Sequence, residues 1–339
     1  MSKNSTIIEQ FELLAEQIKY QIDTEIDRKE AVKHSFRLRQ IRNVINILKK
    51  YPKKIKSGKE LKDIKGVGAG TIKRVDEILE KGKLSEIKIK KKSIENEKYI
   101  EELEKIFGIG RKKAYELVTK HKIKSVKDLR KAYLAGKIDL TEQMLVSLKH
   151  YGKYKQQIPR AEIDEIDKIV QKIGSGIDKK LNVRICGSYR RKKPTSNDID
   201  ILITHPRIVT KKQLLNNKKN YLKLFVNKLT KEGLILDDLT FEDYETKYMG
   251  YCHLSNKHPT RRIDIYYTPY ESYYTSLLHL TGSGEFNRKM RGLAIELGYK
   301  LNEYGLYEKR DSTSKRIPIK SEKEIFDKLG MEYVEPKDR

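Results

Sequence analysis

The sequence predicts an α+β protein of several domains. Two observations support this fold class: apolar residues in the first half recur at helical spacing, and short runs of β-branched residues begin after Gly152. Spacing of three and four residues is typical of amphipathic helices, whereas runs rich in valine and isoleucine favour strands. A chain of 339 residues is long enough for two or more domains, each with its own core.

The first half is predicted to be helical. Apolar residues follow helical spacing from Ile7 to Ile22 and from Ile41 to Leu48. Segments 64–79 and 103–118 share one plan, in which an apolar helix runs into a Gly-x-Gly turn and a basic amphipathic helix follows. We interpret them as an internal repeat of a helical hairpin. The lysine-rich stretch 88–92 between them is predicted to be a linker.

The second half is predicted to be mixed α/β. Its strands are expected where β-branched residues cluster, and its helices where apolar residues recur at helical spacing. A Thr-Gly-Ser-Gly turn is expected to separate the last helix from the segment before it. The expected strands are 183–186, 199–204 and 262–267, and the expected helices are 162–173, 221–232 and 286–297.

Net charge indicates the class of partner. Lys and Arg total 74 against 48 Asp and Glu, which gives +26. A field this positive favours a polyanion, most commonly nucleic acid, although a merely soluble lysine-rich surface is the alternative. No segment approaches the roughly 20 apolar residues of a membrane helix, so no membrane partner is expected. With only two cysteines, we expect a reducing, intracellular compartment. This would be the nucleus in a eukaryote, or the host cell or virion if the chain comes from a large DNA virus.

The two Gly-x-Gly turns are candidate phosphate grips. Glycine lets the backbone approach a ligand closely, and the helix that follows presents free N–H groups. Contacts to phosphate alone would hold DNA without reading its sequence, whereas a tight helix–helix corner is the structural alternative. The residues expected to contact DNA here are Gly66, Gly68, Lys73, Gly108, Gly110, Arg111 and Lys112.

Three aspartates form a candidate metal site. Asp198 and Asp200 lie two residues apart at an apolar strand, so they project to the same face, and carboxylates that close repel unless a cation lies between them. Asp264 lies in a second apolar strand, where it could also simply pair with Arg262. Three carboxylates at one site would suit two Mg²⁺ ions, and the preceding Gly187–Ser188 turn would suit a phosphate. The pattern predicts phosphoryl or nucleotidyl transfer.

These residues lie in blocks that resemble the family X DNA polymerases over essentially the whole chain. The blocks are CGSYRR and DIDILITHP, followed by RRIDI, LTGSGEFNRKMR and GYKLNEYGLY. YPKKIKSGKEL and KGVG match in the first half, and YVEPKDR matches at the end. So many separate blocks in the same order are highly specific to this family.

The resemblance implies an architecture and a reaction. A lyase-like helical domain with one helix-hairpin-helix would span 1–89, and a helical thumb-like subdomain with the second would span 90–148. A nucleotidyltransferase palm with a mixed sheet would span 149–270, and a small α/β nucleotide-selection subdomain 271–339. The implied function is a DNA-directed DNA polymerase that fills short gaps in base excision repair. It would join a dNTP to a primer 3′-hydroxyl, release pyrophosphate and act as a monomer on gapped or nicked double-stranded DNA.

The resemblance also assigns residues to roles. Asp198, Asp200 and Asp264 would be catalytic and hold two Mg²⁺ ions, with Mn²⁺ as a substitute, and Arg262 would contact DNA. The nucleotide would be bound by Gly187, Ser188, Arg191, Ser196, Asn197, Gly282, Asn287 and Arg291. Na⁺ or K⁺ would be bound at the hairpins by the main-chain carbonyls of Lys62, Ile64, Val67, Glu104, Ile106 and Ile109.

Some positions depart from the family pattern. The position of the Schiff-base lysine holds Arg74, whose guanidinium stays protonated and cannot act as an amine nucleophile. Lys73 is the fallback, although one residue along a helix turns a side chain by about 100°. Lyase activity is therefore not expected unless a nearby lysine substitutes. Asn197 stands where glycine is usual, and we expect it to tolerate positive φ.

The sugar-selecting pair is His279-Leu280 and lacks the aromatic rings of the family, so altered sugar discrimination and fidelity are expected. One rival function is a template-independent terminal nucleotidyltransferase. Another is a non-catalytic scaffold that binds DNA ends, although the intact trio of aspartates argues against it.

Overall fold

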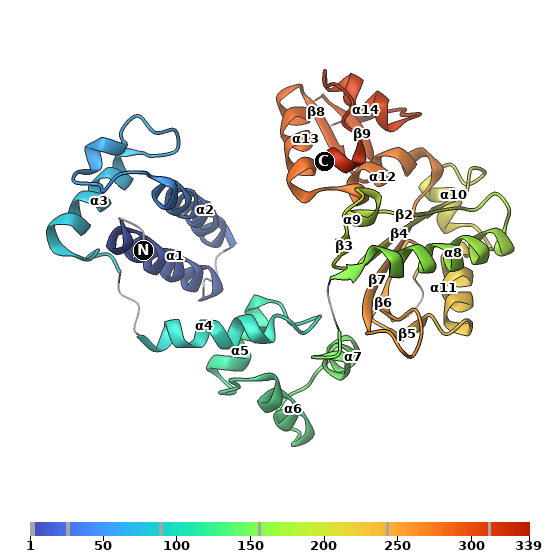
Figure 1. Cartoon of the computed structure of the whole chain (residues 1–339), viewed down its shortest axis with the longest axis horizontal. Helices are drawn as coiled ribbons and strands as arrows, with labels where there is room; N and C mark the ends of the chain where they lie inside the picture. The colour runs from blue at the N-terminus through green and yellow to red at the C-terminus, as the bar shows by residue number, and fades with distance from the viewer. Residues whose placement is uncertain (1–3, 25–27, 88–90, 155–156, 242–243, 311–312) are drawn as a thin grey trace. The chain divides into compact units, whose positions relative to one another are not determined.

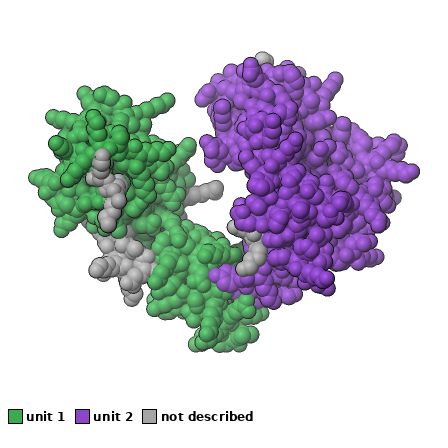
Figure 2. Space-filling model, in the orientation of Figure 1, with its two compact units in different colours: residues 1–139 green, residues 140–339 purple. Residues whose placement is uncertain are grey.

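The structure is a computed structural model that describes residues 4–24, 28–87, 91–154, 157–241, 244–310 and 313–339. It divides into two compact units, residues 1–139 and 140–339, which Figure 2 colours green and purple. Within the described ranges, no helix is long and apolar enough to cross a membrane.

The first unit is helical, as predicted (Figure 1). Phe11, Leu14 and Ile18 are fully buried and pack in one core with Val44 and Leu48, which confirms both predicted amphipathic faces. The helices are α1 (Ser5–Thr24), α2 (Arg28–Lys50), the 3₁₀ helix η1 (Gly58–Leu61), α3 (Ala69–Lys81), α4 (Lys91–Leu103), α5 (Arg111–Thr119) and α6 (Val126–Leu134).

Two expectations for this unit need correction. The first hairpin is preceded by the single turn η1 rather than a full helix. A Cβ at Gly58 would lie 2.4 Å from the carbonyl oxygen of Ile72, so only glycine allows this approach to α3, and glycine disfavours a longer helix. Of the predicted linker 88–92, the first three residues lie outside the described ranges, and Lys91 and Lys92 begin α4.

The second unit is built on a mixed five-stranded sheet, which confirms the predicted fold class (Figure 1). The strand order is β2-β4-β7-β6-β5, in which β4 and β7 are parallel and the other pairs antiparallel. The strands are β2 (Asn182–Ile185), β4 (Ile199–Thr204), β5 (Ile235–Asp238), β6 (Lys247–Cys252) and β7 (Arg261–Tyr267).

One face of this sheet is covered by α8 (Arg160–Ile177) and α11 (Tyr221–Lys231). Ile199, Ile201 and Ile203 point into this fully buried layer, so the residues between them face the other side. Around the sheet lie α7 (Glu142–His150), β1 (Ile158–Pro159), α9 (Gly187–Arg190), β3 (Thr195–Ser196) and α10 (Lys211–Leu215).

The end of the chain forms a smaller α/β subdomain with its own core around Met290, Leu306 and Phe326. Its three-stranded antiparallel sheet has the order β10-β9-β8, and its strands were not foreseen from the sequence. The elements are η2 (Tyr270–Ser272), α12 (Tyr273–Thr281), α13 (Gly284–Glu296), β8 (Tyr299–Asn302), β9 (Gly305–Arg310), β10 (Thr313–Ile317), α14 (Glu322–Lys328) and η3 (Pro336–Asp338).

A buried ion-pair network links this subdomain to the large sheet. Glu322 Oε1 accepts from Arg190 Nη1 at 3.0 Å and from Arg339 Nη1 at 2.7 Å. The same Arg190 nitrogen donates to Thr281 Oγ1 at 2.6 Å. Although burial opposes ionisation, the two arginines hold the pKa of Glu322 below its usual value. The network therefore fixes α9 against the end of α12, and both border the candidate site.

Candidate active site

The parallel pair β4 and β7 brings two aspartates side by side. Asp200 lies opposite Asp264 in the register, and neighbouring strands lie about 4.8 Å apart. The isoleucines that flank both residues are buried, so the two carboxylates face away from α8 and α11. Asp198 precedes β4 directly, two residues from Asp200. The fold thus brings the three predicted carboxylates together, with Asp198 and Asp200 at the start of β4 and Asp264 in the middle of β7.

The carboxylates are held where ionisation is unfavourable. Burial raises the pKa of Asp200 to about 8, and the charges of Asp198 and Asp264 add to the effect. Burial also raises the pKa of Asp264, although the charge of Arg262 opposes this. Neighbouring carboxylates with raised pKa values are stabilised in their charged form when a cation binds between them. The site therefore has a deficit of positive charge.

Arg262 supplies part of that charge. Its Nη2 donates to Asp264 Oδ1 at 2.5 Å, and its Nη1 donates to the carbonyl oxygen of Gly250 at 3.0 Å. Across the described ranges, no three Asp, Glu, His or Cys side chains are already gathered as a metal site. The all-oxygen donor set and the raised pKa of Asp200 nevertheless fit a hard divalent cation. Asp264 would join such a site once Arg262 released it.

A glycine turn lies against the carboxylates. Gly187 begins α9 with φ +55°, and a Cβ at this position would lie 2.7 Å from Asp200 Oδ2. Any side chain would therefore collide with the carboxylate, and left-handed backbone is itself unfavourable for most residues. The glycine turn therefore packs directly against the carboxylate of Asp200, and Ser188 is the next residue in the chain.

Gly187, Ser188, Asp198 and Asp200 line a cavity of about 680 Å³, whereas Asp264 is not among the described residues that line it. Most of the predicted nucleotide-binding residues line it, but Ser196 is buried in β3 opposite Ile158 and does not. The prediction missed Gln157, Lys193, Pro194 and Thr195; of these, only Lys193 carried a signal, as part of a basic run. The predicted residues that line the cavity are Gly187, Ser188, Arg191, Asn197, Asp198, Asp200, Gly282, Asn287 and Arg291, joined by His279, Leu280 and Gly284.

The turn at Asn197 is made differently from the expectation. Among the described residues, the non-glycine positions with left-handed backbone are Lys122, Gln157 and Lys192, so Asn197 does not use positive φ. Gln157 and Lys192 border the same site, and Gln157 Oε1 accepts from Thr195 Oγ1 at 2.9 Å. Left-handed backbone is therefore found at Gln157 and Lys192, and not at Asn197, where it was expected.

Arg191 lines the cavity together with the cations Lys193 and Arg291. Its Nη1 donates to the carbonyl oxygen of Thr281, whereas its Nε is buried with no hydrogen-bond partner among the described residues. Burial lowers the pKa of this guanidinium, because the charged form loses contact with water. A guanidinium with an unused donor suits the oxygen atoms of a phosphate.

The opposite wall comes from α12 and α13. Asn287 Nδ2 donates to the carbonyl oxygen of His279 at 2.7 Å, and Arg291 Nε donates to the carbonyl oxygen of Asn287 at 3.3 Å. Burial lowers the pKa of His279, which favours the neutral ring near pH 7. Asn287 is therefore tied to the main chain at His279, and Arg291 is tied to the main chain of Asn287.

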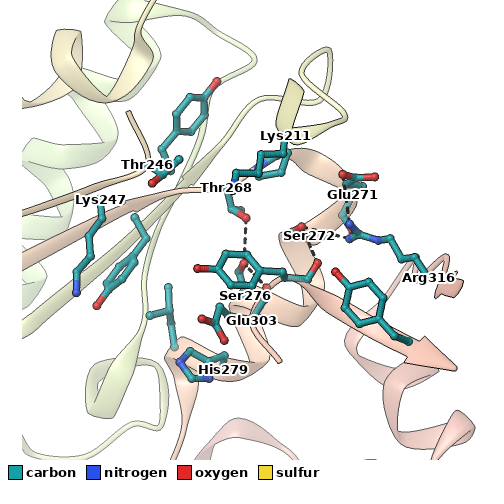
Figure 3. Close-up of a pocket in the computed structure, with 16 residues that line it drawn as sticks. Lys211, Thr246, Lys247, Thr268, Glu271, Ser272, Ser276, His279, Glu303 and Arg316 are labelled. Carbon is teal, nitrogen blue, oxygen red and sulfur yellow. Dashed lines mark hydrogen bonds and ion pairs between the residues drawn. The ribbon is translucent and has the colours of Figure 1, made fainter. Parts of the chain in front are cut away.

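His279 and Leu280 also line a second cavity of about 690 Å³, shown in Figure 3. Ser276 Oγ lies 3.0 Å from Thr268 Oγ1 and donates to the carbonyl oxygen of Glu303 at 2.8 Å. These bonds join the end of β7 to α12 and to the turn between β8 and β9. His279 and Leu280 thus line both cavities.

The two hairpin turns of the first unit have matching geometry. Gly66 has φ +98° and Gly108 has φ +91°. The amide of Val67 donates to Ile64 and that of Ile109 donates to Ile106, each at 3.0 Å. A carbonyl oxygen has two lone pairs, so these acceptors retain capacity for another donor or a cation. Cation binding by the predicted carbonyls stays a prediction.

The cations after the turns differ in availability. Lys73 is exposed on α3. Arg111 is already paired, because its Nη2 donates to Glu97 Oε2 at 2.6 Å and its Nη1 to Glu104 Oε2 at 3.3 Å. DNA would have to compete with two glutamates for this guanidinium, which the local sequence pattern did not indicate.

Four family models match the chain in order. A helix-hairpin-helix domain matches residues 2–84, and the fingers domain of DNA polymerase lambda matches 101–154. The DNA polymerase beta palm matches residues 157–270, and the DNA polymerase beta thumb matches 276–339. The palm match includes all three aspartates, and the thumb match includes the other wall of the cavity.

Whole-chain relatives agree with these models. DNA polymerase lambda of Rattus norvegicus is 33% identical over 312 residues, which cover 87% of this chain and 51% of that protein. DNA polymerase lambda of Arabidopsis thaliana is 29% identical over 311 residues, with 87% and 56% covered. DNA nucleotidylexotransferase of Xenopus laevis is 27% identical over 326 residues, with 87% and 62% covered. The chain spans about half the length of the curated relatives it matches.

Proposed function

Because this chain belongs to the family X DNA polymerases, we propose that it is a DNA-directed DNA polymerase that fills short gaps in base excision repair. The observation that carries the proposal is the register of Asp200 against Asp264 beside the Gly187 turn. Carboxylates next to a phosphate cradle are the parts that nucleotidyl transfer requires. The substrates would be a dNTP and a primer 3′-hydroxyl, with pyrophosphate released.

Each wall of the cavity has its own task in this reaction. Asp198, Asp200 and Asp264 would hold two Mg²⁺ ions, or Mn²⁺ in their place. When bound, these ions would lower the pKa of the 3′-hydroxyl and neutralise charge on the transferred phosphoryl group. Arg191 and Ser188 would hold the triphosphate, and the glycine turn would let it approach the carboxylates.

The smaller subdomain would position the new base pair. Asn287 and Arg291 project from α13 into the cavity, and the link between Arg190 and Glu322 holds that subdomain against the cradle. Closure around the dNTP would exclude water and align the 3′-oxygen with the α-phosphate. The reaction thus depends on positioning by side chains from both subdomains.

The DNA would be held largely through its backbone. The hairpins at Gly66–Gly68 and Gly108–Gly110 would grip the two segments that flank a gap, with Na⁺ or K⁺ at the main-chain carbonyls. We assign these tasks to domains 1–89 and 90–148, the palm to 149–270 and nucleotide selection to 271–339. The protein would act as an intracellular monomer on gapped or nicked double-stranded DNA.

A second candidate function is template-independent nucleotidyl transfer. Two observations favour it: the similarity to a DNA nucleotidylexotransferase, and the absence of a Phe, Tyr or Trp side chain at His279 and Leu280. Template-dependent synthesis is preferred because the first unit has two matching hairpins suited to duplex DNA.

Primer extension with Mg²⁺ distinguishes these functions. On one-nucleotide-gapped DNA, we expect insertion of the single nucleotide complementary to the template, and no extension of a single-stranded primer. Extension of the single strand without regard to template would favour a terminal transferase. Tight binding of gapped DNA without incorporation of any dNTP would favour a DNA-end scaffold.

A further inference from the structure

The first unit contains a cavity of about 1040 Å³ between α2 and the first hairpin. Its wall includes four arginines, Arg37, Arg39, Arg42 and Arg74, together with the hairpin glycines Gly66 and Gly68. The part of the chain that the structure describes adds no lysine to this wall. Guanidinium groups in a concave surface suit the oxygen atoms of a phosphate monoester. In the proposed function the hairpins grip the DNA segments that flank a gap, so the phosphate monoester offered to this cavity would be the 5′-phosphate at the downstream DNA end.

Two of these arginines are already occupied by a carboxylate of the chain itself. Arg74 donates from Nε to Glu86 Oε1 and from Nη2 to Glu86 Oε2 at 3.4 Å. Arg37 Nη2 donates to Glu86 Oε2 at 2.6 Å. Glu86 thus occupies a two-arginine fork of the kind that would bind a phosphate.

The position of Glu86 is fixed, but its carboxylate is not enclosed. Gln17 Nε2 donates to the main-chain oxygen of Glu86 at 2.8 Å, which holds this residue against the helices. The Glu86 side chain is 33% exposed and that of Arg37 is 36% exposed. Ion pairs this exposed exchange readily with other partners. The carboxylate can therefore leave the fork without unfolding the unit.

We infer that Glu86 is a built-in competitor for the 5′-phosphate at the DNA end. The phosphate enters the arginine fork only after Glu86 has released Arg74 and Arg37. The inference rests on the proposed function, because it takes the ligand to be the downstream end of gapped DNA. Since no lysine is found among the described residues that line the cavity, the end would be held by charge and hydrogen bonds and not by a Schiff base.

The test measures how strongly the full-length protein discriminates between DNA ends. Fluorescence anisotropy gives the Kd for one-nucleotide-gapped DNA with a downstream 5′-phosphate or a 5′-hydroxyl, at fixed salt and without dNTP. Glu86→Gln keeps the shape of the side chain and removes its charge. We expect the ratio of the 5′-hydroxyl Kd to the 5′-phosphate Kd to rise about threefold to tenfold.

Glu80→Gln is the matched control. Glu80 is exposed on α3, and its substitution changes the net charge by the same amount away from the cavity. Both Kd values should fall together, which leaves their ratio at the wild-type value. Arg37→Gln removes one arm of the fork and should lower the ratio, which keeps the inference testable if Glu86→Gln does not fold.

Several outcomes would overturn the inference. A wild-type ratio in Glu86→Gln, or a ratio that rises equally in Glu80→Gln, would mean that Glu86 does not compete with the phosphate. Inorganic phosphate should weaken the binding of Glu86→Gln to 5′-phosphorylated DNA and leave its Kd for 5′-hydroxyl DNA unchanged. If inorganic phosphate weakened the binding of both DNAs equally, free phosphate would be the ligand of the cavity. None of these measurements needs nucleotide incorporation, so failure of the polymerase proposal would be recognised separately.

Discussion

Asp200→Asn should change how the stability of the metal-free protein depends on pH. An aspartate in an unfolded chain has a pKa near 3.9, whereas burial and the neighbouring carboxylates raise the pKa of Asp200 to about 8. Between these values the folded protein retains a proton that the unfolded chain has released. The stabilising effect of that proton is complete below pH 4 and is lost as the pH rises to 8.

The size of the effect follows from the same two values. Between the two pKa values, the free energy of unfolding of wild type falls by about 1.4 kcal/mol per pH unit. Most of this loss of stability therefore occurs between pH 5 and pH 8. Relaxation around a partly exposed carboxylate reduces the total, and we expect Asp200→Asn to be more stable than wild type by about 1–3 kcal/mol at pH 8. Near pH 4 the two proteins should be almost equal.

Urea unfolding in EDTA at pH 4, 5, 6, 7 and 8 measures this difference, with Asp338→Asn as an exposed control. Mg²⁺ added at pH 8 should stabilise wild type more than Asp200→Asn, because the bound cation offsets the charge that burial disfavours. Parallel pH profiles for wild type and Asp200→Asn would refute the reasoning, as would equal stabilisation of both by Mg²⁺.

The other predictions concern the cradle, the subdomain link and the lyase position. Gly187→Ala should lower kcat for gap filling at least tenfold, because its Cβ would meet Asp200 Oδ2 at 2.7 Å, whereas Gly292→Ala has nothing within 4 Å and should retain activity. Glu322→Gln should destabilise the protein by about 2–4 kcal/mol in thermal or urea unfolding, since the buried Arg339 and the partly buried Arg190 lose their counter-charge; an unchanged midpoint would count against the link. Borohydride should trap no adduct on a 5′-deoxyribose phosphate substrate. An adduct that forms with wild type and is lost in Lys73→Ala would show that Lys73 is a Schiff-base nucleophile and that the protein has lyase activity.

Local patterns in the sequence predicted much of the second unit. The alternation Ile-Asp-Ile around Asp200 and Asp264 indicated strands with one buried face, and the structure confirms both. The register between them could not be read from either strand, because a parallel pairing depends on the long connection between β4 and β7. The resemblance to a family, and not the strand pattern, predicted that the two aspartates share one site.

Strands β8, β9 and β10 escaped prediction for a physical reason. Among the side chains of these strands whose burial the structure describes, only a few are buried, such as Leu301 and Leu306, and charged residues interrupt the apolar pattern. A short strand of a small sheet needs few apolar residues when helices supply most of the core. Periodicity therefore gives a weak signal there.

Ion pairs were the other feature that the sequence did not reveal. Glu86 meets Arg37 across 49 positions of the chain, and Glu322 meets Arg190 across 132. A count of basic residues treats each arginine as available, whereas tertiary folding assigns some of them to internal carboxylates. Such pairs determine which cations a polyanion can reach.

The most direct test of the central claim compares wild type with Asp264→Ala in single-nucleotide incorporation on gapped DNA with Mg²⁺. We expect wild type to insert the templated nucleotide and Asp264→Ala to be about a thousandfold slower, equivalent to about 4 kcal/mol of transition-state stabilisation. Thermal unfolding would verify that the variant is folded. Equal rates in the two folded proteins would contradict the claim that the paired aspartates of β4 and β7 form the catalytic centre.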